Sequence, residues 1–212
     1  MENKPELEKY ILSHIDEEDA VLQALTRETY LQVLRPRMLS GRLQGKMLEM
    51  FSRMVQPKRI LEIGTFTGYS AICLAKGLPE GGKLHTIEIN DELENMAQKY
   101  FIKAGLGNKI IQHIGDAKII IPSLKETFDL VFIDGNKRDY STYFDLVFEK
   151  VNSGGMMIAD NILWSGKVAE AIEPSDEQTL GILNFNKKIK DDPRVSQVIL
   201  PVRDGLMLIR KT

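Results

Sequence analysis

Two apolar runs in the chain end abruptly in side chains that carry oxygen. The run Leu130–Ile133 is followed by Asp134, and the run Met156–Ala159 is followed by Asp160 and Asn161. If both runs are neighbouring parallel strands, their carboxyl ends lie at the same edge of a sheet and the three side chains converge. Oxygen donors with no His or Cys favour a hard cation, with Mg²⁺ as the first choice and Ca²⁺ or Mn²⁺ as alternatives. An isolated Asp-Asn pair would also suit a turn or cap, but the matching position of Asp134 predicts a metal site.

A lysine follows the first of these strand ends by three residues, as Asp134-Gly135-Asn136-Lys137. Two adjacent hydroxyls of a substrate can chelate a hard cation, which lowers the pKa of the bound hydroxyl. Lys137 could take that proton, if burial favours its neutral form, or hold the resulting oxyanion. The alternative is an ordinary surface lysine. We predict that Lys137 and Asp134 take part in the reaction.

A glycine-rich turn, LEIGTFTGYS, lies between an earlier apolar run and a helical segment. Gly64 and Gly68 allow the backbone to approach a ligand closely. Their spacing is G-x-x-x-G, which differs from the dinucleotide-binding G-x-G-x-x-G, and the turn lacks the Lys-Ser/Thr of a phosphate-binding loop. The sequence therefore favours a nucleoside-containing ligand without a pyrophosphate.

Further acidic residues suit such a ligand. Glu88 lies at the end of the next strand, 20 residues after Gly68, where a carboxylate can accept hydrogen bonds from ribose hydroxyls; a surface glutamate is the alternative. Asp116 and the backbone of Ala117, after the third strand, suit an adenine edge. Glu62 lies inside an apolar strand, and a buried carboxylate needs partners, which the sulfonium or amino group of a methyl donor would supply.

The elements that must position these residues alternate in type. Residues 1–55 show helical spacing, whereas strand-like and helical segments alternate from Lys58 onward, with Asp91 as a helix N-cap. Alternating strands and helices predict a doubly wound, mostly parallel seven-stranded α/β sheet with an N-terminal helical extension, and the last two strands form an antiparallel hairpin. The predicted strands are 59–63, 83–89, 109–114, 128–134, 154–160, 195–200 and 205–211. We predict one domain, 1–212, with helices over 1–57 and the donor-binding core over 58–212.

Composition narrows the class of protein. The 212 residues include 28 basic and 30 acidic side chains and carry a net charge of −2, which gives no bulk attraction to nucleic acid or membranes. Cys73 is the single cysteine, so no disulfide can form within the chain. The start MENKPELEKY has no apolar secretory segment, and no apolar run is long enough to span a membrane. We predict a cytoplasmic protein, with Met47, Met50 and Met54 as core residues.

Together these motifs resemble the class I S-adenosylmethionine-dependent methyltransferases. The resemblance is closest to the metal-dependent O-methyltransferases of the catechol and caffeoyl-CoA type, and it covers essentially the whole chain. The motifs that carry it are MLSGRLQGKML, LEIGTFTGYSAICLA, TIEIN, GDA, FIDGNKRDY, ADNILWSG and PVRDGL. The family's Asp-x-x-Lys arrangement matches Asp134 to Lys137 and favours the catalytic role of the lysine. The family often has an acidic residue in the first motif, where this chain has Gln44.

The resemblance implies contacts for both substrates. On the donor side it implies Ser40, Glu62, Gly64, Thr65, Ser70, Glu88, Asp116, Ala117 and Asp134. On the acceptor side the candidates are Met38, Lys137, Arg203 and Trp164, whose ring could stack on a flat aromatic. The resemblance also implies a homodimer with the N-terminal helices near the acceptor.

The predicted reaction is direct methyl transfer from S-adenosylmethionine to a hydroxyl of a small catechol-like or hydroxycinnamoyl-type acceptor chelated to the metal. No covalent protein intermediate is required, because the protein aligns the reactants and excludes water. One alternative is a tRNA hydroxyuridine O-methyltransferase of the same fold, which the charge balance disfavours. Another is a non-catalytic donor-binding protein, which would be expected to lack the four residues Asp134, Lys137, Asp160 and Asn161.

Overall fold

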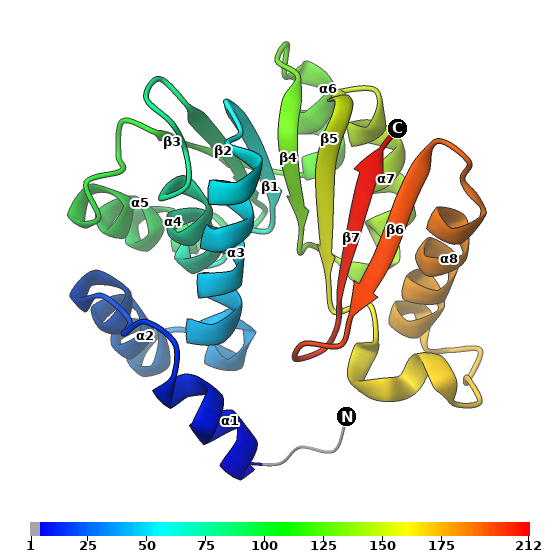
Figure 1. The fold of residues 1–212 in the computed structure, drawn as a ribbon, viewed down its shortest axis with the longest axis horizontal. Coiled ribbons are helices and arrows are strands. Elements are labelled where there is room, and N and C mark those ends of the chain that lie inside the picture. Colours follow the sequence, from blue (N-terminus) through cyan, green and yellow to red (C-terminus); the bar gives the residue numbers. More distant parts are fainter. Residues whose placement is uncertain (1–4) are drawn as a thin grey trace.

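The computed structural model describes residues 5–212 and contains one seven-stranded sheet with the order β3-β2-β1-β4-β5-β7-β6 (Figure 1). All neighbouring strands run parallel except β7, which is antiparallel to both β5 and β6. The doubly wound sheet with its terminal hairpin is therefore confirmed. The strands are β1 Arg59–Ile63, β2 Lys83–Glu88, β3 Ile110–Ile114, β4 Phe128–Ile133, β5 Val151–Asp160, β6 Val195–Leu200 and β7 Leu206–Lys211.

Helices cover both faces of the sheet, with α3 crossing in front of it and α7 behind β7 in Figure 1. Alternate residues of β4 face opposite layers: Leu130 and Phe132 pack with α3–α5, and Val131 and Ile133 pack with α6–α8. Burial on both faces explains why this strand is continuously apolar.

The α-helices are α1 Pro5–Ser13, α2 Ala20–Gln32, α3 Gly41–Val55, α4 Tyr69–Ala75, α5 Glu94–Lys103, α6 Ala117–Ser123, α7 Tyr140–Phe148 and α8 Glu177–Asp191; the 3₁₀ turns are η1 Pro36–Met38, η2 Asp91–Leu93, η3 Lys137–Asp139 and η4 Trp164–Ala169.

The register of the central strands aligns their carboxyl ends. Ile63 of β1 pairs with Ile133 of β4, which pairs with Ala159 of β5. The residues that follow, Gly64 and Asp134, and the last residue of β5, Asp160, therefore lie in one row across the sheet. Successive strands run outward from β1 through β2 to β3, and β4 then lies on the opposite side of β1. This reversal between β1 and β4 is the switch point at which open α/β sheets bind ligands.

Close packing of the backbone in this row requires a glycine at position 64. Its φ is +103°, and a Cβ atom built on it would lie 2.3 Å from the backbone oxygen of Asp134. We expect Gly64→Ala to lower the free energy of unfolding by at least about 3 kcal/mol, or roughly 6–12 °C in melting temperature. Gly81 is a matched control, since it also has positive φ (+73°) but nothing within 4 Å of an added Cβ. Gly81→Ala should cost about 1 kcal/mol, and equal losses in thermal denaturation would contradict the packing argument.

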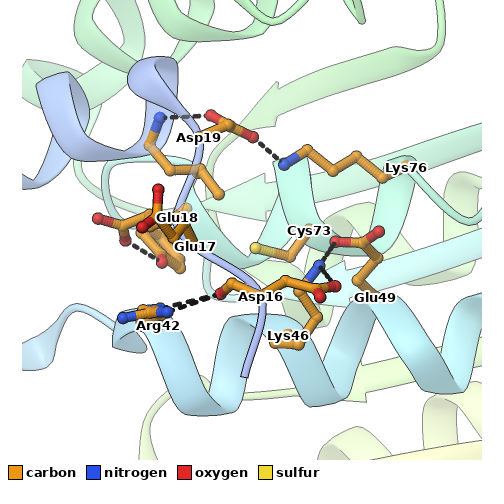
Figure 2. A pocket seen from close by; sticks show the side chains of 11 residues that line it. Asp16, Glu17, Glu18, Asp19, Arg42, Lys46, Glu49, Cys73 and Lys76 are labelled. Atoms are coloured by element: carbon orange, nitrogen blue, oxygen red, sulfur yellow. Dashed lines mark hydrogen bonds and ion pairs between the residues drawn. The ribbon is translucent and has the colours of Figure 1, made fainter. Parts of the chain in front are cut away.

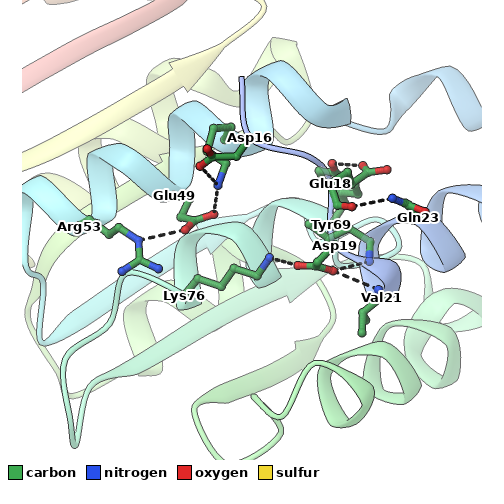
Figure 3. A network of polar contacts seen from close by, with 11 residues as sticks. Asp16, Glu18, Asp19, Val21, Gln23, Glu49, Arg53, Tyr69 and Lys76 are labelled. Atoms are coloured by element: carbon green, nitrogen blue, oxygen red, sulfur yellow. Dashed lines mark hydrogen bonds and ion pairs between the residues drawn. The ribbon is translucent and has the colours of Figure 1, made fainter. Parts of the chain in front are cut away.

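The segment between α1 and α2 is tied to α3 and α4 by polar contacts (Figures 2 and 3). Arg42 donates a hydrogen bond from Nη2 to the Ile15 carbonyl at 2.8 Å, and Lys76 forms an ion pair with Asp19. A cavity of about 160 Å³ lies among these groups. These contacts fix the start of α2. The other end of α2 leads into η1, whose residues lie near the carboxyl ends of the strands. The predicted single domain, with helices over 1–57 and a donor-binding core over 58–212, stays a prediction.

Several local expectations differ from the structure. Strand β5 begins at Val151 rather than Gly154. Asp91, predicted as an N-cap, is instead the first residue of η2; Asn90 caps this turn by accepting a hydrogen bond from the Glu92 N–H, and α5 follows it directly. Met50 and Met54, predicted as core, are 50% and 73% exposed on α3. No helix among residues 5–212 has the length and apolar character needed to cross a membrane.

Candidate active site

A cavity of about 1220 Å³ lies at the carboxyl ends of the strands. It is larger than the roughly 300–1,000 Å³ of a typical small-molecule site, so it has room for two substrates. Every predicted site residue lines it except Glu62, which is fully buried in β1 directly before the lining residues Ile63 and Gly64. The predicted residues in its wall are Met38, Ser40, Gly64, Thr65, Ser70, Glu88, Asp116, Ala117, Asp134, Lys137, Asp160, Asn161, Trp164 and Arg203.

Glu62 is fully buried, and only one of its two carboxylate oxygens accepts a hydrogen bond from the described residues. Its Oε2 accepts a hydrogen bond from the Thr86 hydroxyl at 2.6 Å, and Thr86 in turn contacts the Thr65 hydroxyl at 2.5 Å. Its Oε1 has no hydrogen-bond partner among the described residues. Burial raises the pKa of this carboxyl to about 8, against the opposing effects of the Ser70 and Thr86 hydroxyls and with a further rise from the charges of Asp134 and Glu88. An unpartnered buried carboxylate oxygen under a cavity is a feature that a cationic ligand group would satisfy.

Replacing Glu62 by glutamine should change how stability depends on pH. The folded-state pKa of about 8 lies above the ordinary value of 4.5, so the folded protein holds a proton that the unfolded chain releases. The stability of the donor-free protein should therefore fall as pH rises from about 4.5 to about 8. Glu62→Gln should remove this loss and melt at a higher temperature than the wild type at pH 8.5, but not at pH 5. Scanning calorimetry at the two pH values measures this, and equal pH dependences would contradict it.

The same variant should respond less to a cationic donor. Ionised Glu62 can pair with a positive group and glutamine cannot. We expect the rise in melting temperature caused by S-adenosylmethionine to be smaller in Glu62→Gln than in the wild type at pH 8.5. A purely structural effect of the substitution would shift the variant's melting temperature equally with and without the donor, so the donor-induced rise would equal that of the wild type.

Two other acidic residues are held by backbone N–H groups. Glu88, at the end of β2, accepts hydrogen bonds from Phe66 N at 2.7 Å and Asn90 N at 3.0 Å. Asp116 caps α6 by accepting from Lys118 N at 2.8 Å. These contacts fix the carboxylates at the cavity wall while leaving lone pairs for a ligand.

Lys137 is buried at the base of the cavity, with 8% of its surface exposed. Its Nζ donates hydrogen bonds to Asp134 Oδ1 at 2.8 Å and to the Tyr140 hydroxyl at 2.7 Å. The Tyr140 hydroxyl lies 3.2 Å from the Ile133 carbonyl and 3.0 Å from the Asp160 carbonyl, and these two acceptors share its single hydrogen. Burial raises the pKa of Tyr140 well above its ordinary value, so this hydroxyl stays neutral. It is a fixed acceptor that, with Asp134, holds the ammonium and leaves one N–H free.

Tyr140 was not among the predicted site residues. Its position three residues after Lys137, across the η3 turn into α7, was the available signal. The spacing alone does not show that the ring turns back under the strand ends.

Asp160 lies beside Asp134 in a buried setting. Its Oδ1 accepts from Asn161 N at 2.7 Å and its Oδ2 from Gln44 Nε2 at 2.5 Å. Burial, and then the charge of Asp134, raises the pKa of Asp160 to about 6. Two carboxylates that disfavour each other's charge, next to an amide side chain, are a donor set that a hard divalent cation fits.

The set contains only two carboxylates. Accordingly, no group of three or more His, Cys, Asp or Glu residues suited to a metal occurs in residues 5–212. The metal site of Asp134, Asp160 and Asn161 stays a prediction.

Apart from Lys137, the predicted acceptor residues come from three separate segments. Met38 ends η1 and is 59% exposed, and Trp164 begins η4 after β5. Arg203, in the turn between β6 and β7, donates from Nη1 to Gln44 Oε1 at 3.0 Å. The structure brings all three to the cavity wall.

Comparison with known proteins supports a family assignment. The profile of a family described as O-methyltransferase matches residues 12–212. The caffeoyl-CoA O-methyltransferase of Petroselinum crispum is 33% identical over 179 residues, covering 79% of this chain and 74% of that protein.

Solved structures agree. The O-methyltransferase TomG from Streptomyces achromogenes, involved in tomaymycin synthesis and solved in complex with SAM, has a TM-score of 0.92 and 31% identity over 100% of this chain and 99% of that chain. An O-methyltransferase from Bacillus cereus, solved with SAH, has a TM-score of 0.91 and 27% identity over 98% and 97% of the two chains.

The sheet order and the strand-end cavity thus define a Rossmann-like methyltransferase. More narrowly, the chain belongs to the O-methyltransferase family and is an S-adenosylmethionine-dependent O-methyltransferase.

Proposed function

We propose that this enzyme methylates one hydroxyl of a vicinal diphenol, either a small catechol-like molecule or the ring of a hydroxycinnamoyl thioester, held with a divalent cation. The observation that carries the proposal is the buried row in which Lys137 contacts Asp134 and Asp160 lies on the next strand. The resemblance to caffeoyl-CoA O-methyltransferases supports the acceptor class.

Asp134, Asp160 and Asn161 would hold the cation, with Mg²⁺ favoured over Ca²⁺ or Mn²⁺ for an all-oxygen donor set. When bound, the cation would supply positive charge that lowers the pKa of a chelating hydroxyl. The residues of the chain do the remaining work. Asp134 and Tyr140 hold Lys137. As an ammonium, it would direct its remaining N–H at the acceptor oxygen; as a neutral amine, its nitrogen lone pair would take the hydroxyl proton.

The acceptor oxygen attacks the methyl carbon in line with the donor's carbon–sulfur bond. The new carbon–oxygen bond forms as the carbon–sulfur bond breaks, and the electron pair leaves with sulfur as a neutral thioether. Charge is lost in this step, so a cavity that aligns the two reactants and excludes water is the main requirement.

On the donor side we propose contacts from Ser40, Glu62, Gly64, Thr65, Ser70, Glu88, Asp116, Ala117 and Asp134. The two ends of this set have distinct chemistry. Glu62 lies in β1 just before the glycine turn, and its Oε1 has no partner within residues 5–212, which suits the cationic amino acid part of the donor. Glu88 and Asp116 follow β2 and β3, which suits ribose and adenine. Met38, Trp164 and Arg203 would contact the acceptor. The homodimer and the cytoplasmic location stay predictions.

The tRNA hydroxyuridine alternative gains no support from the relatives described above. A single experiment separates the two functions. The enzyme is incubated with methyl-labelled donor and Mg²⁺, in one arm with a host metabolite extract and in the other with bulk tRNA, and products are identified by mass spectrometry. We expect the label in a small phenolic ether. Label in a modified uridine alone would favour the alternative and overturn the proposal.

A further inference from the structure

Gln44 links the N-terminal part of the chain to the row of strand ends. It lies on α3 and is only 1% exposed. Its Nε2 donates to Asp160 Oδ2 at 2.5 Å, and its Oε1 accepts from Arg203 Nη1 at 3.0 Å. A buried amide therefore connects a predicted metal ligand with a predicted acceptor contact.

The two partners dictate the orientation of this amide. An arginine side chain can only donate hydrogen bonds, and an ionised carboxylate can only accept them. The oxygen of Gln44 must therefore face Arg203, and its nitrogen must face Asp160. A glutamate at this position could accept from Arg203 but would repel Asp160, whereas an apolar residue would satisfy neither.

Asp160 is consequently held at three points. Its Oδ1 accepts from Asn161 N at 2.7 Å, its Oδ2 accepts from Gln44, and its backbone carbonyl accepts from Tyr140 at 3.0 Å. Each carboxylate oxygen has capacity for more than one contact, so both can still bind a cation. The hydrogen bonds fix the direction in which the remaining lone pairs point.

The helix that carries Gln44 is itself packed too closely to shift. At the next residue, Gly45, an added Cβ would lie 2.6 Å from Tyr69 Cε1 and 2.8 Å from Cys73 Sγ, both on α4. The approach of α3 to α4 places the amide within reach of β5. Rigid support of this kind is what a ligand-orienting residue needs.

We infer that Gln44 is a positioning residue for Asp160, that Arg203 fixes the orientation of Gln44, and that the pair sets the affinity of the site for a divalent cation. The inference rests on the proposed metal function. Gln44 is also the position at which the family resemblance implies an acidic residue.

The test is Mn²⁺ binding measured by titration calorimetry in the presence of SAH. Gln44→Met keeps a similar volume and removes both hydrogen bonds. We expect its dissociation constant for Mn²⁺ to rise about 10–100-fold, with SAH affinity within about twofold of the wild type. Gln112→Met is the matched control, since this glutamine lies on β3 away from the cavity lining, and it should leave both affinities unchanged.

Arg203→Met provides a second, milder variant should Gln44→Met fail to fold. It leaves the amide of Gln44 free to turn, so Mn²⁺ affinity should fall several-fold. If Arg203 acts through Gln44, the double variant should bind Mn²⁺ no more weakly than Gln44→Met alone.

The outcomes are distinguishable. A folded Gln44→Met variant with wild-type Mn²⁺ affinity, or one that loses SAH affinity equally, would overturn the inference and leave the proposed function standing. A wild-type protein without measurable Mn²⁺ affinity would overturn the metal part of the proposed function and the inference with it.

Discussion

Replacing Lys137 by methionine is expected to lower kcat by about 10²–10⁴-fold, the range of contribution from a positioned proton-transfer group. The variant removes the ammonium that contacts Asp134 at 2.8 Å and Tyr140 at 2.7 Å, while retaining most of the side-chain volume. Donor binding should change by less than about threefold, because Asp134 is the one proposed donor residue to which Lys137 is hydrogen-bonded among the described residues. Steady-state kinetics and calorimetric titration of SAH measure the two quantities separately.

Lys211→Met is a matched control for this variant. Lys211 also makes two hydrogen bonds, to the carbonyls of Phe148 and Val151, and lies over an aromatic ring at 4.4 Å from its centroid. It does not line the cavity, so kcat should stay near the wild-type value. The pH–rate profile adds a mechanistic readout: without Lys137 the rise of rate with pH should move to higher pH, because the acceptor hydroxyl must then ionise with the help of the cation alone. A Lys137→Met variant with unchanged rate and profile would eliminate its catalytic role.

Asp160→Asn is expected to separate activity from stability. It removes one of the two carboxylates that we assign to the cation, and we expect a loss of about 10²–10³-fold in Mg²⁺-dependent methyl transfer, corresponding to several kcal/mol of transition-state stabilisation. The melting temperature of the metal-free variant should nevertheless fall less between pH 4 and pH 7 than that of the metal-free wild type.

The sign of that stability change follows from the pKa of Asp160. Burial and the charge of Asp134 raise it to about 6 from an ordinary 3.8, so the folded state disfavours the ionised form and the metal-free wild type loses stability as pH rises from about 4 to about 6. Asparagine carries no charge and avoids this loss. Thermal denaturation at pH 4 and pH 7 checks the prediction; an inactive variant whose melting temperature falls with pH as much as that of the wild type would contradict it.

The residues of the strand ends were predictable because their signal is local. An apolar strand that stops at Asp134 or Asp160 places a carboxylate at the edge of the sheet in any parallel arrangement, and the observed register puts the two in one row. The alternation of strands and helices likewise determined the layers, since strands buried on both faces need helices on both sides.

Other features depend on packing between distant segments. The reach of Gln44 to Asp160 spans 116 residues of sequence, and it depends on how closely α3 approaches α4. The hydrogen bond from Thr86 to Glu62 joins adjacent strands, and nothing near Glu62 in the sequence marks it. Met50 and Met54 have helical spacing, but periodicity alone does not say which side of α3 faces the core, and both are exposed.

The most direct test of the central claim compares two isomeric acceptors. Catechol has adjacent hydroxyls that can chelate a cation together, whereas resorcinol has the same atoms with the hydroxyls one carbon further apart. The enzyme is incubated with S-adenosylmethionine and each isomer, with Mg²⁺ or with EDTA, and the methyl ethers are quantified by mass spectrometry. We predict a monomethyl ether from catechol with Mg²⁺, at least about 100-fold less with EDTA, recovery when excess Mg²⁺ is restored, and little or no product from resorcinol. Equal methylation of both isomers, or a rate that EDTA does not change, would contradict the account.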